Sequence, residues 1–255
     1  IFLYQTNKEL QTKKQYTEWH EHIKTIIDFI NNYRLKGLDK NYEKEIEIKD
    51  GFIFNKKTKY TIQQINFYIK LLKEKMIYAS FRPEIESEFI PGYNWLMTQM
   101  EIKIGQKPSH THYPIWAWYQ WNGIKQARPD LRYSSHLYKG THGVRLTIQK
   151  DIRDILLSDF ELWHSPFYYK DYIASNHLQE ELFEQKLKKQ NLENIRFEQL
   201  PPHLKKEIEE SWQLIFDINK SAPNYLNDIN TKSIQATFWS LNLDEVMKVE
   251  EFIAR

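Results

Sequence analysis

The sequence contains no cysteine among its 255 residues and only seven glycines. Without cysteine, the chain forms no disulfide, no cysteine-ligated zinc site and no thiol nucleophile. The glycines occur in neither the G-x-G-x-x-G nor the G-x-x-x-x-G-K order, so no Rossmann-type dinucleotide site or P-loop is indicated. The G-x-S-x-G and H-E-x-x-H motifs are also missing, which removes the commonest hydrolase signatures.

Charge of one sign is not in excess, because 36 Lys and Arg stand against 34 Asp and Glu, for a net charge of +2. This balance is not typical of a dedicated nucleic-acid binder, although it leaves room for a local basic groove. No apolar run approaches the roughly 20 residues that span a bilayer. The first ten residues also lack the basic and apolar regions of a signal peptide. We therefore expect a cytoplasmic protein that does not enter membranes.

Aromatic residues are abundant: the chain has 8 Trp, 16 Tyr and 14 Phe, and 41% of its residues are hydrophobic. A chain of this composition can bury a sizeable core, and intrinsic disorder is not expected. We therefore expect a single globular domain over residues 1–255.

Hydrophobic spacing predicts strands that flank blocks of helix, without strict alternation of the two. The expected helices cover 13–35, 61–76, 83–105, 178–190 and 203–218. The expected strands cover 1–6, 112–121, 143–149, 155–160, 233–241 and 246–253, with a hairpin around Asp50 and Gly51. This order predicts an α+β fold. The helical block and hairpin, at about residues 10–78, are expected to be an insertion outside the main core.

One expected strand is unusually aromatic, with the sequence HYPIWAWYQW at 112–121. Strand alternation places Trp116 and Trp118 on one face, and Ile115, Ala117 and Tyr119 on the other. Such strands are more often core than binding platforms, but indole N–H groups need partners and paired Trp rings can stack on a flat ligand. We expect Trp116 and Trp118 to lie beside a cleft.

Several polar residues are candidates for binding or metal coordination. Arg132, in the turn RPDLR, can clamp a phosphate or carboxylate, or form a surface ion pair with Asp130. Asp159 ends an apolar strand, a position that suits either a site residue or a helix cap. His110 and His112 form only a weak metal pattern without a third ligand, so we expect no metal.

The closing strand alternates clearly between two faces. Ile234, Ala236 and Phe238 would face the core, whereas Gln235, Thr237 and Trp239 would share the other face. This second face is equally typical of a pocket wall and of a half-solvated edge strand.

Four ordered runs resemble a bacterial family catalogued only as a domain of unknown function. They are PIWAWY at 114–119, PDLR at 129–132, LLSDFELWH at 156–164 and IQATFW at 234–239. The resemblance covers residues 93–255 and, loosely, the opening strand. It implies no activity.

A more distant resemblance does imply one. DNA-modifying ADP-ribosyltransferase toxins of toxin-antitoxin modules open with a strand reading L-Y-H and close with one reading Q-A-E, where this chain has Leu3-Tyr4-Gln5 and Gln235-Ala236-Thr237. In that fold the first motif holds NAD, and the closing Glu stabilises an oxocarbenium-like transition state. The resemblance implies an ADP-ribosyltransferase-like mixed sheet core. It also implies a toxin or phage-defence effector that modifies nucleic acid or protein, with an antitoxin as partner.

Both motifs differ from that family at the decisive residue, because Gln5 replaces its His and Thr237 replaces its Glu. Gln5 can still hydrogen-bond a ribose or carboxamide, whereas Thr237 offers no negative charge to a developing cation. A carboxylate from elsewhere would then be needed, and Asp159 is the best candidate.

The resemblance implies a catalytic group and a NAD-binding group of residues. The catalytic group is Asp159, Gln235 and Thr237, and the NAD-binding group is Gln5, Thr6, Trp118, Arg132 and Trp239. Gln5 and Gln235 would orient the nicotinamide half, and Arg132 would contact the pyrophosphate. Trp118 or Trp239 would stack on a ring. The alternative is a non-catalytic binding or assembly protein with an aromatic-rich surface.

Overall fold

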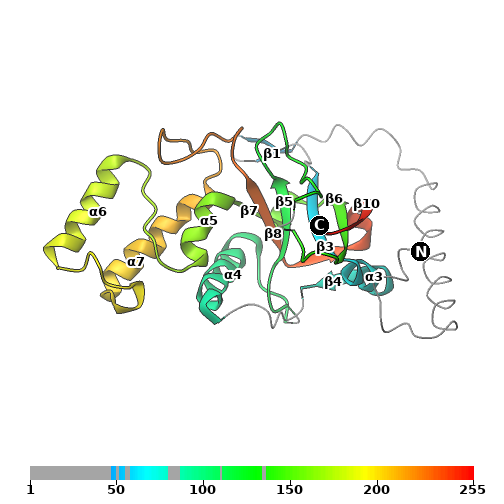
Figure 1. Ribbon diagram of the computed structural model, residues 1–255, viewed down its shortest axis with the longest axis horizontal. Coiled ribbons are helices and arrows are strands. Elements are labelled where there is room, and N and C mark those ends of the chain that lie inside the picture. Colours follow the sequence, from blue (N-terminus) through cyan, green and yellow to red (C-terminus); the bar gives the residue numbers. More distant parts are fainter. Residues whose placement is uncertain (1–46, 50–51, 55–57, 80–86, 110, 134–135) are drawn as a thin grey trace.

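The computed structural model of the chain describes residues 47–49, 52–54, 58–79, 87–109, 111–133 and 136–255, with side chains from residue 58 onward (Figure 1). The strand expected at 1–6 and the helix expected at 13–35 lie outside the described residues. Gln5 and Thr6 lie there too.

A six-stranded antiparallel sheet forms the centre of the fold, in the order β10-β6-β3-β5-β8-β7. Its strands are β3 (Lys59–Gln64), β5 (Ile115–Gln120), β6 (His142–Ile148), β7 (Leu156–Asp159), β8 (Ile234–Phe238) and β10 (Val246–Ile253). Two small antiparallel pairs accompany it: β1 (Glu47–Lys49) with β2 (Phe52–Phe54), and β4 (Met76–Tyr78) with β9 (Ser240–Asn242). Lys49 pairs with Phe52, which confirms the hairpin predicted around Asp50 and Gly51.

The helices of the described residues gather mainly at one end of the elongated molecule (Figure 1). They are α3 (Ile65–Glu74), α4 (Ile90–Ile104), α5 (Phe160–Phe167), α6 (His177–Lys189) and α7 (Pro202–Ser211). Short 3₁₀ turns cover Ser87–Phe89, Ile152–Asp154, Phe197–Gln199, Trp212–Phe216 and Leu243–Glu245. Mixed helices and strands confirm the α+β class.

Two helices begin later than expected, and the helix expected at 203–218 ends at Ser211, where a 3₁₀ turn over Trp212–Phe216 follows. The helix expected at 61–76 begins only at Ile65, because the preceding residues form β3, which pairs with both β5 and β6. Sheet pairing therefore overrides a helical spacing that continues through Thr61. The helix expected from Pro83 begins at Ile90, with Pro91 in its first turn, and it ends before Gly105 as expected.

Residues 59–78 belong to the main core, so the expected insertion cannot extend to residue 78. β3 lies third in the central sheet, and Tyr68, Leu71 and Leu72 of α3 pack in the core beneath it. In the rest of the expected insertion, residues 47–49 and 52–54 form the separate β1–β2 pair, and residues 10–46 lie outside the described residues.

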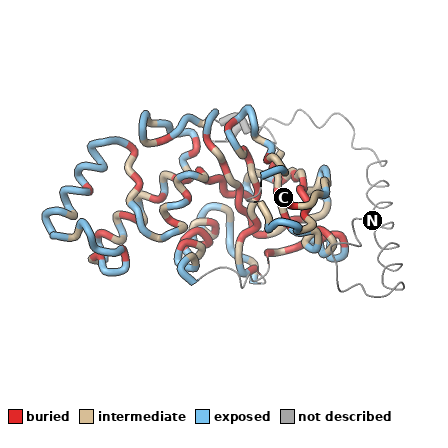
Figure 2. The backbone as a smooth tube through the Cα atoms, viewed as in Figure 1, coloured by how far each residue is buried: buried red, intermediate tan, exposed pale blue. Residues whose placement is uncertain are grey.

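Hydrophobic clusters cover both faces of the sheet, as Figure 2 shows by the buried segments on and beside the strands. The first cluster includes Ile115 and Ala117 of β5 and lies against α3. The second includes Leu156 of β7 and residues of α4, α5 and α7. In this second cluster Trp212 is fully buried and donates its indole N–H to the carbonyl of Asp171 at 2.7 Å. The helices of this cluster pack against β7, β8 and part of β5, and the cleft described next opens over β3, β5 and β8.

Candidate functional site

A cleft of about 1300 Å³ opens over the strand face that carries Trp118 and Gln235, and it extends past the end of β3 to Asn66, Phe67 and Lys70 of α3. Its volume exceeds the roughly 300 to 1,000 Å³ of ordinary small-molecule sites. The described residues that line it are Tyr60, Ile62, Gln63, Gln64, Asn66, Phe67, Lys70, Ile77, Tyr78, Trp116, Ala117, Trp118, Trp121, Asn122, Tyr133, His136, Leu137, Tyr138, Lys139, Phe160, Ser233, Gln235 and Arg255.

A row of paired side chains crosses four strands, and its members on β3, β5 and β8 form the floor of the cleft. Tyr60 of β3 pairs with Trp118 of β5, Trp118 pairs with Gln235 of β8, and Gln235 pairs with Ser158 of β7. Paired residues in antiparallel strands point to the same face, with Cβ atoms about 4.5 to 5.5 Å apart. The register therefore places an aromatic pair next to an amide and a hydroxyl.

One wall of the cleft is an aromatic loop. The rings of Tyr133 and His136 lie 5.1 and 5.9 Å from that of Trp121. A ring nitrogen of His136 lies 3.0 Å from the carbonyl oxygen of Asp130. Burial lowers the pKa of His136 below its ordinary value of 6.5, so its ring is neutral at pH 7.

A charged cluster on the sheet fastens this loop. Arg145 of β6 donates to the carbonyl of Pro129 and, at 2.9 Å, to the carboxylate of Glu250 on β10. Arg128 and Lys248 also pair with Glu250. Burial alone would raise the pKa of Glu250, but hydrogen bonds from these three cations hold it at about 2. Glu250 is thus a fixed anion that ties the loop to the edge of the sheet.

The opposite wall comes from the start of α5. The ring of Phe160 packs edge-on against Trp118, with centroids 5.0 Å apart. Ser233 donates its hydroxyl to the carbonyl of Trp121, which joins this wall to the aromatic loop. Trp118 is therefore held from one side while it remains part of the cleft lining.

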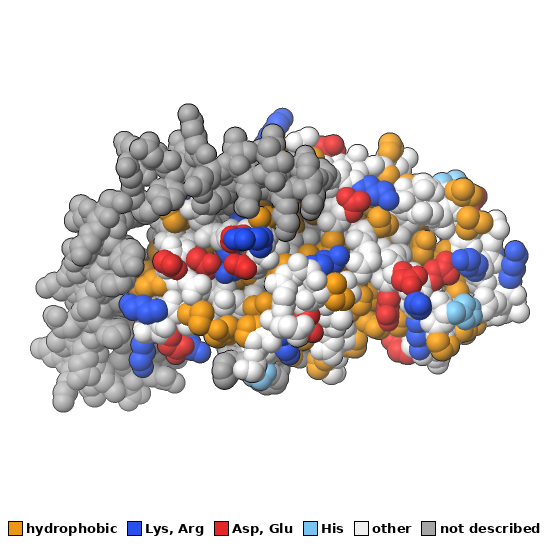
Figure 3. Space-filling view, turned by 180° about the vertical axis from the view of Figure 1, so that it is seen from behind, with side chains coloured by type: hydrophobic (Ala, Val, Ile, Leu, Met, Phe, Trp, Pro, Cys, Tyr) orange, Lys and Arg blue, Asp and Glu red, His pale blue; other side chains and the backbone are white. Residues whose placement is uncertain are grey.

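The described lining carries cations but no acid. Lys70, Lys139 and Arg255 line the cleft, and none of its described lining residues is Asp or Glu. Elsewhere charges of both signs are interspersed, as Figure 3 shows at the helical end of the molecule. Lys70 also pairs with Glu74, 3.8 Å away outside the lining. A cleft that combines aromatic rings, amides and cations suits an anionic ligand with a flat ring.

Three buried polar atoms in or beside the cleft have no hydrogen-bond partner. They are the indole nitrogen of Trp116, the hydroxyl of Ser158 and the amide oxygen of Gln235. Each atom is buried, and all three side chains project from the cleft face of the sheet. Sequence reasoning selected Gln235 and Trp116 for a cleft and noted Ser158 at the end of its strand, but the lack of partners appears only in three dimensions.

Two of the residues predicted from sequence, Trp118 and Gln235, meet in this cleft. They pair directly between β5 and β8, and both line the cleft. Trp116 also lines it, so the expectation that Trp116 and Trp118 lie beside a cleft is confirmed.

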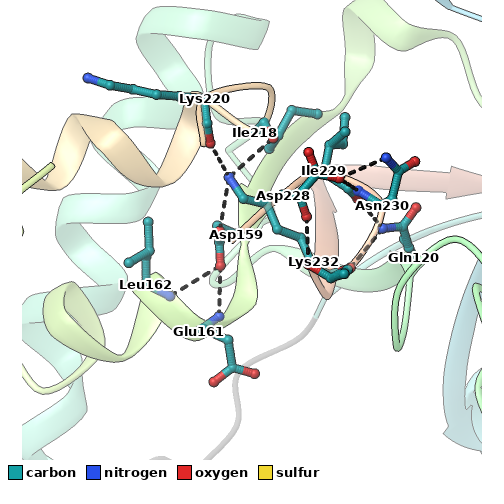
Figure 4. A network of polar contacts seen from close by, with 11 residues as sticks. Gln120, Asp159, Glu161, Leu162, Ile218, Lys220, Asp228, Ile229, Asn230 and Lys232 are labelled. Carbon is teal, nitrogen blue, oxygen red and sulfur yellow. Dashed lines mark hydrogen bonds and ion pairs between the residues drawn. The ribbon is translucent and has the colours of Figure 1, made fainter. Parts of the chain in front are cut away.

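Asp159 is not part of the described cleft lining. Its carboxylate accepts hydrogen bonds from the backbone N–H groups of Glu161 at 3.0 Å and Leu162 at 3.3 Å, so it caps α5 (Figure 4). It also lies 3.3 Å from the ammonium of Lys232, and both side chains are almost fully buried. Of the two readings of Asp159, the structure bears out the helix cap.

Lys232, which sequence reasoning missed, organises the loop before β8. Its ammonium donates to the carbonyls of Ile218 at 3.2 Å and Lys220 at 2.9 Å, and its own carbonyl accepts from Gln120 at 2.8 Å (Figure 4). A single lysine ahead of a strand carries no sequence signal for such a role. The network aligns β8 between β5 and β7.

Thr237 and Trp239 are not among the described residues that line the cleft, although both follow Gln235 along the chain. Thr237 is fully buried and donates to the carbonyl of Leu156 at 3.3 Å. Trp239 packs among the helices and donates to the carbonyl of Gly105 at 2.9 Å. β8 lies between β5 and β7, so the interpretation of the closing strand as a half-solvated edge strand is wrong.

Arg132 is exposed and lies outside the described lining. Its guanidinium pairs with Asp130 at 2.5 Å, and hydrogen bonds from Arg132 lower the pKa of Asp130 to about 2. The structure therefore contains the surface ion pair with Asp130, which was the alternative role expected for Arg132.

Within the described residues, no group of three His, Asp or Glu side chains is placed to hold a metal ion. Over the same residues, no helix combines the length and apolar character needed to cross a bilayer.

Comparison with known proteins gives one match. A family model described as a domain of unknown function, DUF3841, matches residues 58–247, which include β3, β5, β6, β7 and β8 of the central sheet but only the start of β10. No curated protein and no solved structure matches the chain.

Proposed function

Because this chain belongs to the DUF3841 family of domains of unknown function, its activity has to be argued from its own residues, and we propose that the cleft binds a nucleotide. NAD is the specific ligand that we propose. One observation carries this proposal: the described lining combines aromatic rings with Lys70, Lys139 and Arg255 and contains no Asp or Glu side chain.

The two halves of a nucleotide match the two kinds of lining residue. A base or nicotinamide ring stacks on an indole such as Trp118. Phosphate groups interact with Lys and Arg, which here face no competing acid in the described lining. NAD, which has two rings joined by a pyrophosphate, also suits a cleft larger than an ordinary small-molecule site.

The resemblance to ADP-ribosyltransferases supports NAD over other nucleotides, because Gln235 of the closing motif lies in the cleft. Transfer of ADP-ribose needs an anion beside the developing oxocarbenium ion. Thr237 and Asp159 are both turned to other partners. We therefore propose NAD binding first. A toxin or phage-defence transferase acting on nucleic acid or protein, with an antitoxin as partner, requires a carboxylate from outside the described lining.

A second function, assembly with a protein partner through aromatic side chains, is favoured by a different observation. Tyr138 and Tyr133 at the mouth of the cleft are 86% and 59% exposed. Exposed tyrosines next to a hollow are common in protein interfaces. Under this reading the cleft would take a side chain or loop of the partner.

Calorimetric titration with NAD tests the first proposal, together with an assay for nicotinamide release. We expect one-site binding that weakens about 5- to 100-fold in Trp118→Ala, because base stacking contributes about 1 to 3 kcal/mol. Lys139→Ala should weaken binding more at low salt than at high salt. Lys188→Ala removes an exposed lysine of α6 outside the cleft lining and should bind like the parent.

Absence of heat with NAD, ADP and AMP would refute the nucleotide proposal. If nicotinamide is released in the same assay, the transferase reading gains support. If no nucleotide binds and Tyr138→Ala abolishes self-association or partner capture, assembly becomes the better reading.

A further inference from the structure

Buried polar side chains in this protein are generally satisfied by hydrogen bonds. The ammonium of Lys59 donates to the carbonyl of Lys150 at 3.0 Å, and Gln120 donates to the carbonyls of Ile229 and Lys232. Against this background, four buried side-chain atoms of the described residues have no partner; two of them belong to Trp116 and Gln235 of the cleft lining, and a third belongs to Ser158, the strand partner of Gln235. An unsatisfied buried polar group costs about 1 to 3 kcal/mol, so three together indicate a missing partner.

The strand register places these three side chains on the same face of the neighbouring strands β5, β8 and β7. Gln235 is directly opposite Ser158 across the β7 and β8 pair. Trp116 lies two residues before Trp118, the partner of Gln235 on β5, and so points to the same face. The ring of Trp116 also lies 5.4 Å from that of Trp163 in the helical cluster. The three polar groups therefore lie where the cleft meets the helices.

The chemistry of these groups specifies what can satisfy them. An indole N–H only donates, a hydroxyl donates and accepts, and the Gln amide presents either an oxygen or an NH₂ group. None of the three carries a charge, so a phosphate or carboxylate would gain no ion pair here. A neutral ring edge that carries adjacent donors and acceptors satisfies all three.

We propose that Trp116, Ser158 and Gln235 form a recognition site for the neutral amide edge of the ligand's ring, such as a carboxamide or the amino and carbonyl edge of a nucleobase. This inference rests on the proposed nucleotide function and extends it to the chemical group that is recognised. The ring lies beside these residues, stacked against Trp118, and the phosphates extend outward to the cations of the lining.

Matched dinucleotides test the site on the intact chain. NAD is compared with two analogues, one with the nicotinamide carboxamide replaced by a carboxylate and one with adenine replaced by hypoxanthine. We expect one of these analogues to bind roughly 3- to 10-fold more weakly than NAD, as for the loss of one neutral hydrogen bond. The other analogue should bind like NAD, because only one ring occupies the site.

Two variants test whether these residues recognise the ring edge. Gln235→Leu and Ser158→Ala should each reduce the discrimination to about 2-fold or less, with a melting temperature equal to or above that of the parent, because each removes an unsatisfied group. Gln64→Leu, which removes another amide of the lining, should retain the discrimination. A merely structural role would instead lower the melting temperature and leave the discrimination unchanged.

The outcomes separate this inference from the proposed function. If NAD binds but neither analogue is discriminated, or if Gln235→Leu keeps the discrimination, the recognition site is refuted and nucleotide binding stands. If no dinucleotide binds but free nicotinamide or uracil quenches tryptophan fluorescence in the parent and not in Gln235→Leu, the recognition site stands and the nucleotide proposal fails. Absence of every one of these signals refutes both.

Discussion

Asp159→Asn removes one charge from the buried pair with Lys232 and leaves the cap of α5 in place, because Asn caps helices about as well as Asp. Both side chains of the pair are at most 3% exposed, so water cannot replace the lost partner. Breaking such a pair typically destabilises a protein by about 3 to 5 kcal/mol. Lys232 keeps its bonds to the carbonyls of Ile218 and Lys220, so we expect a loss near the lower end, about 3 kcal/mol.

A double-mutant cycle measures the coupling directly. Lys232→Met leaves the Asp159 carboxylate with only the two N–H groups of α5, so it should also lose about 3 kcal/mol. The double variant Asp159→Asn/Lys232→Met has no uncompensated charge. It should be more stable than the sum of the single losses predicts, by about 1 to 3 kcal/mol.

Equilibrium unfolding in urea, followed by tryptophan fluorescence, gives these values if the slope of the transition stays constant. If the loss in the double variant equals the sum of the two single losses to within about 0.5 kcal/mol, Asp159 and Lys232 are not coupled, and the buried ion pair is refuted. The same variants test function. Folded Asp159→Asn should bind NAD like the parent, because its carboxylate faces α5 and Lys232. Loss of binding at unchanged stability would show that Asp159 acts in the cleft after all.

Three further predictions concern the core, the closing strand and pH. Phe238→Ala removes a fully buried ring and should reduce the free energy of unfolding by about 3 to 5 kcal/mol, measured in urea; a loss below about 1 kcal/mol would contradict the core assignment. Thr237→Glu buries an unpaired charge and should leave no cooperative transition in circular dichroism, whereas a folded variant with faster nicotinamide release would restore the transferase reading. Burial lowers the pKa of His136 in the folded protein below 6.5, so the unfolded chain binds more protons than the folded protein as pH falls. The contribution of His136 to the free energy of unfolding is therefore complete above pH 6.5 and is lost below it. His136→Phe should reduce the fall in unfolding free energy between pH 7.5 and 5.5, and an unchanged fall would exclude His136 as its source.

Strands were predictable where alternation or aromatic content is strong. The positions of β5, β6, β8 and β10 agree with expectation because their side chains alternate between faces that are filled in different ways. The sequence did not predict β3, because the apolar residues Ile62, Ile65 and Tyr68 continue with helical spacing across the boundary between strand and helix. Only pairing with β5 and β6, which are far away in sequence, decides its conformation.

The candidate site was predictable only in part. Trp118 and Gln235 could be selected from their strand faces, but alternation alone cannot show that helices cover Thr237 two residues further on. Asp159 illustrates the same limit, because its residue type and position suit both a cap and a site. Its ion pair with Lys232, 73 positions away, decides between them.

The position of β8 has a consequence for how the chain folds. β8 is the partner of both β5 and β7, yet the chain between β7 and β8 includes α5, α6 and α7. During synthesis, β5 and β7 each present an unpaired edge until β8 has emerged, and exposed edges promote association between chains. Sheets that depend on such distant pairings also fold slowly. We therefore expect refolding to be limited by insertion of β8, and chains shortened before residue 234 to aggregate rather than to form a smaller stable sheet.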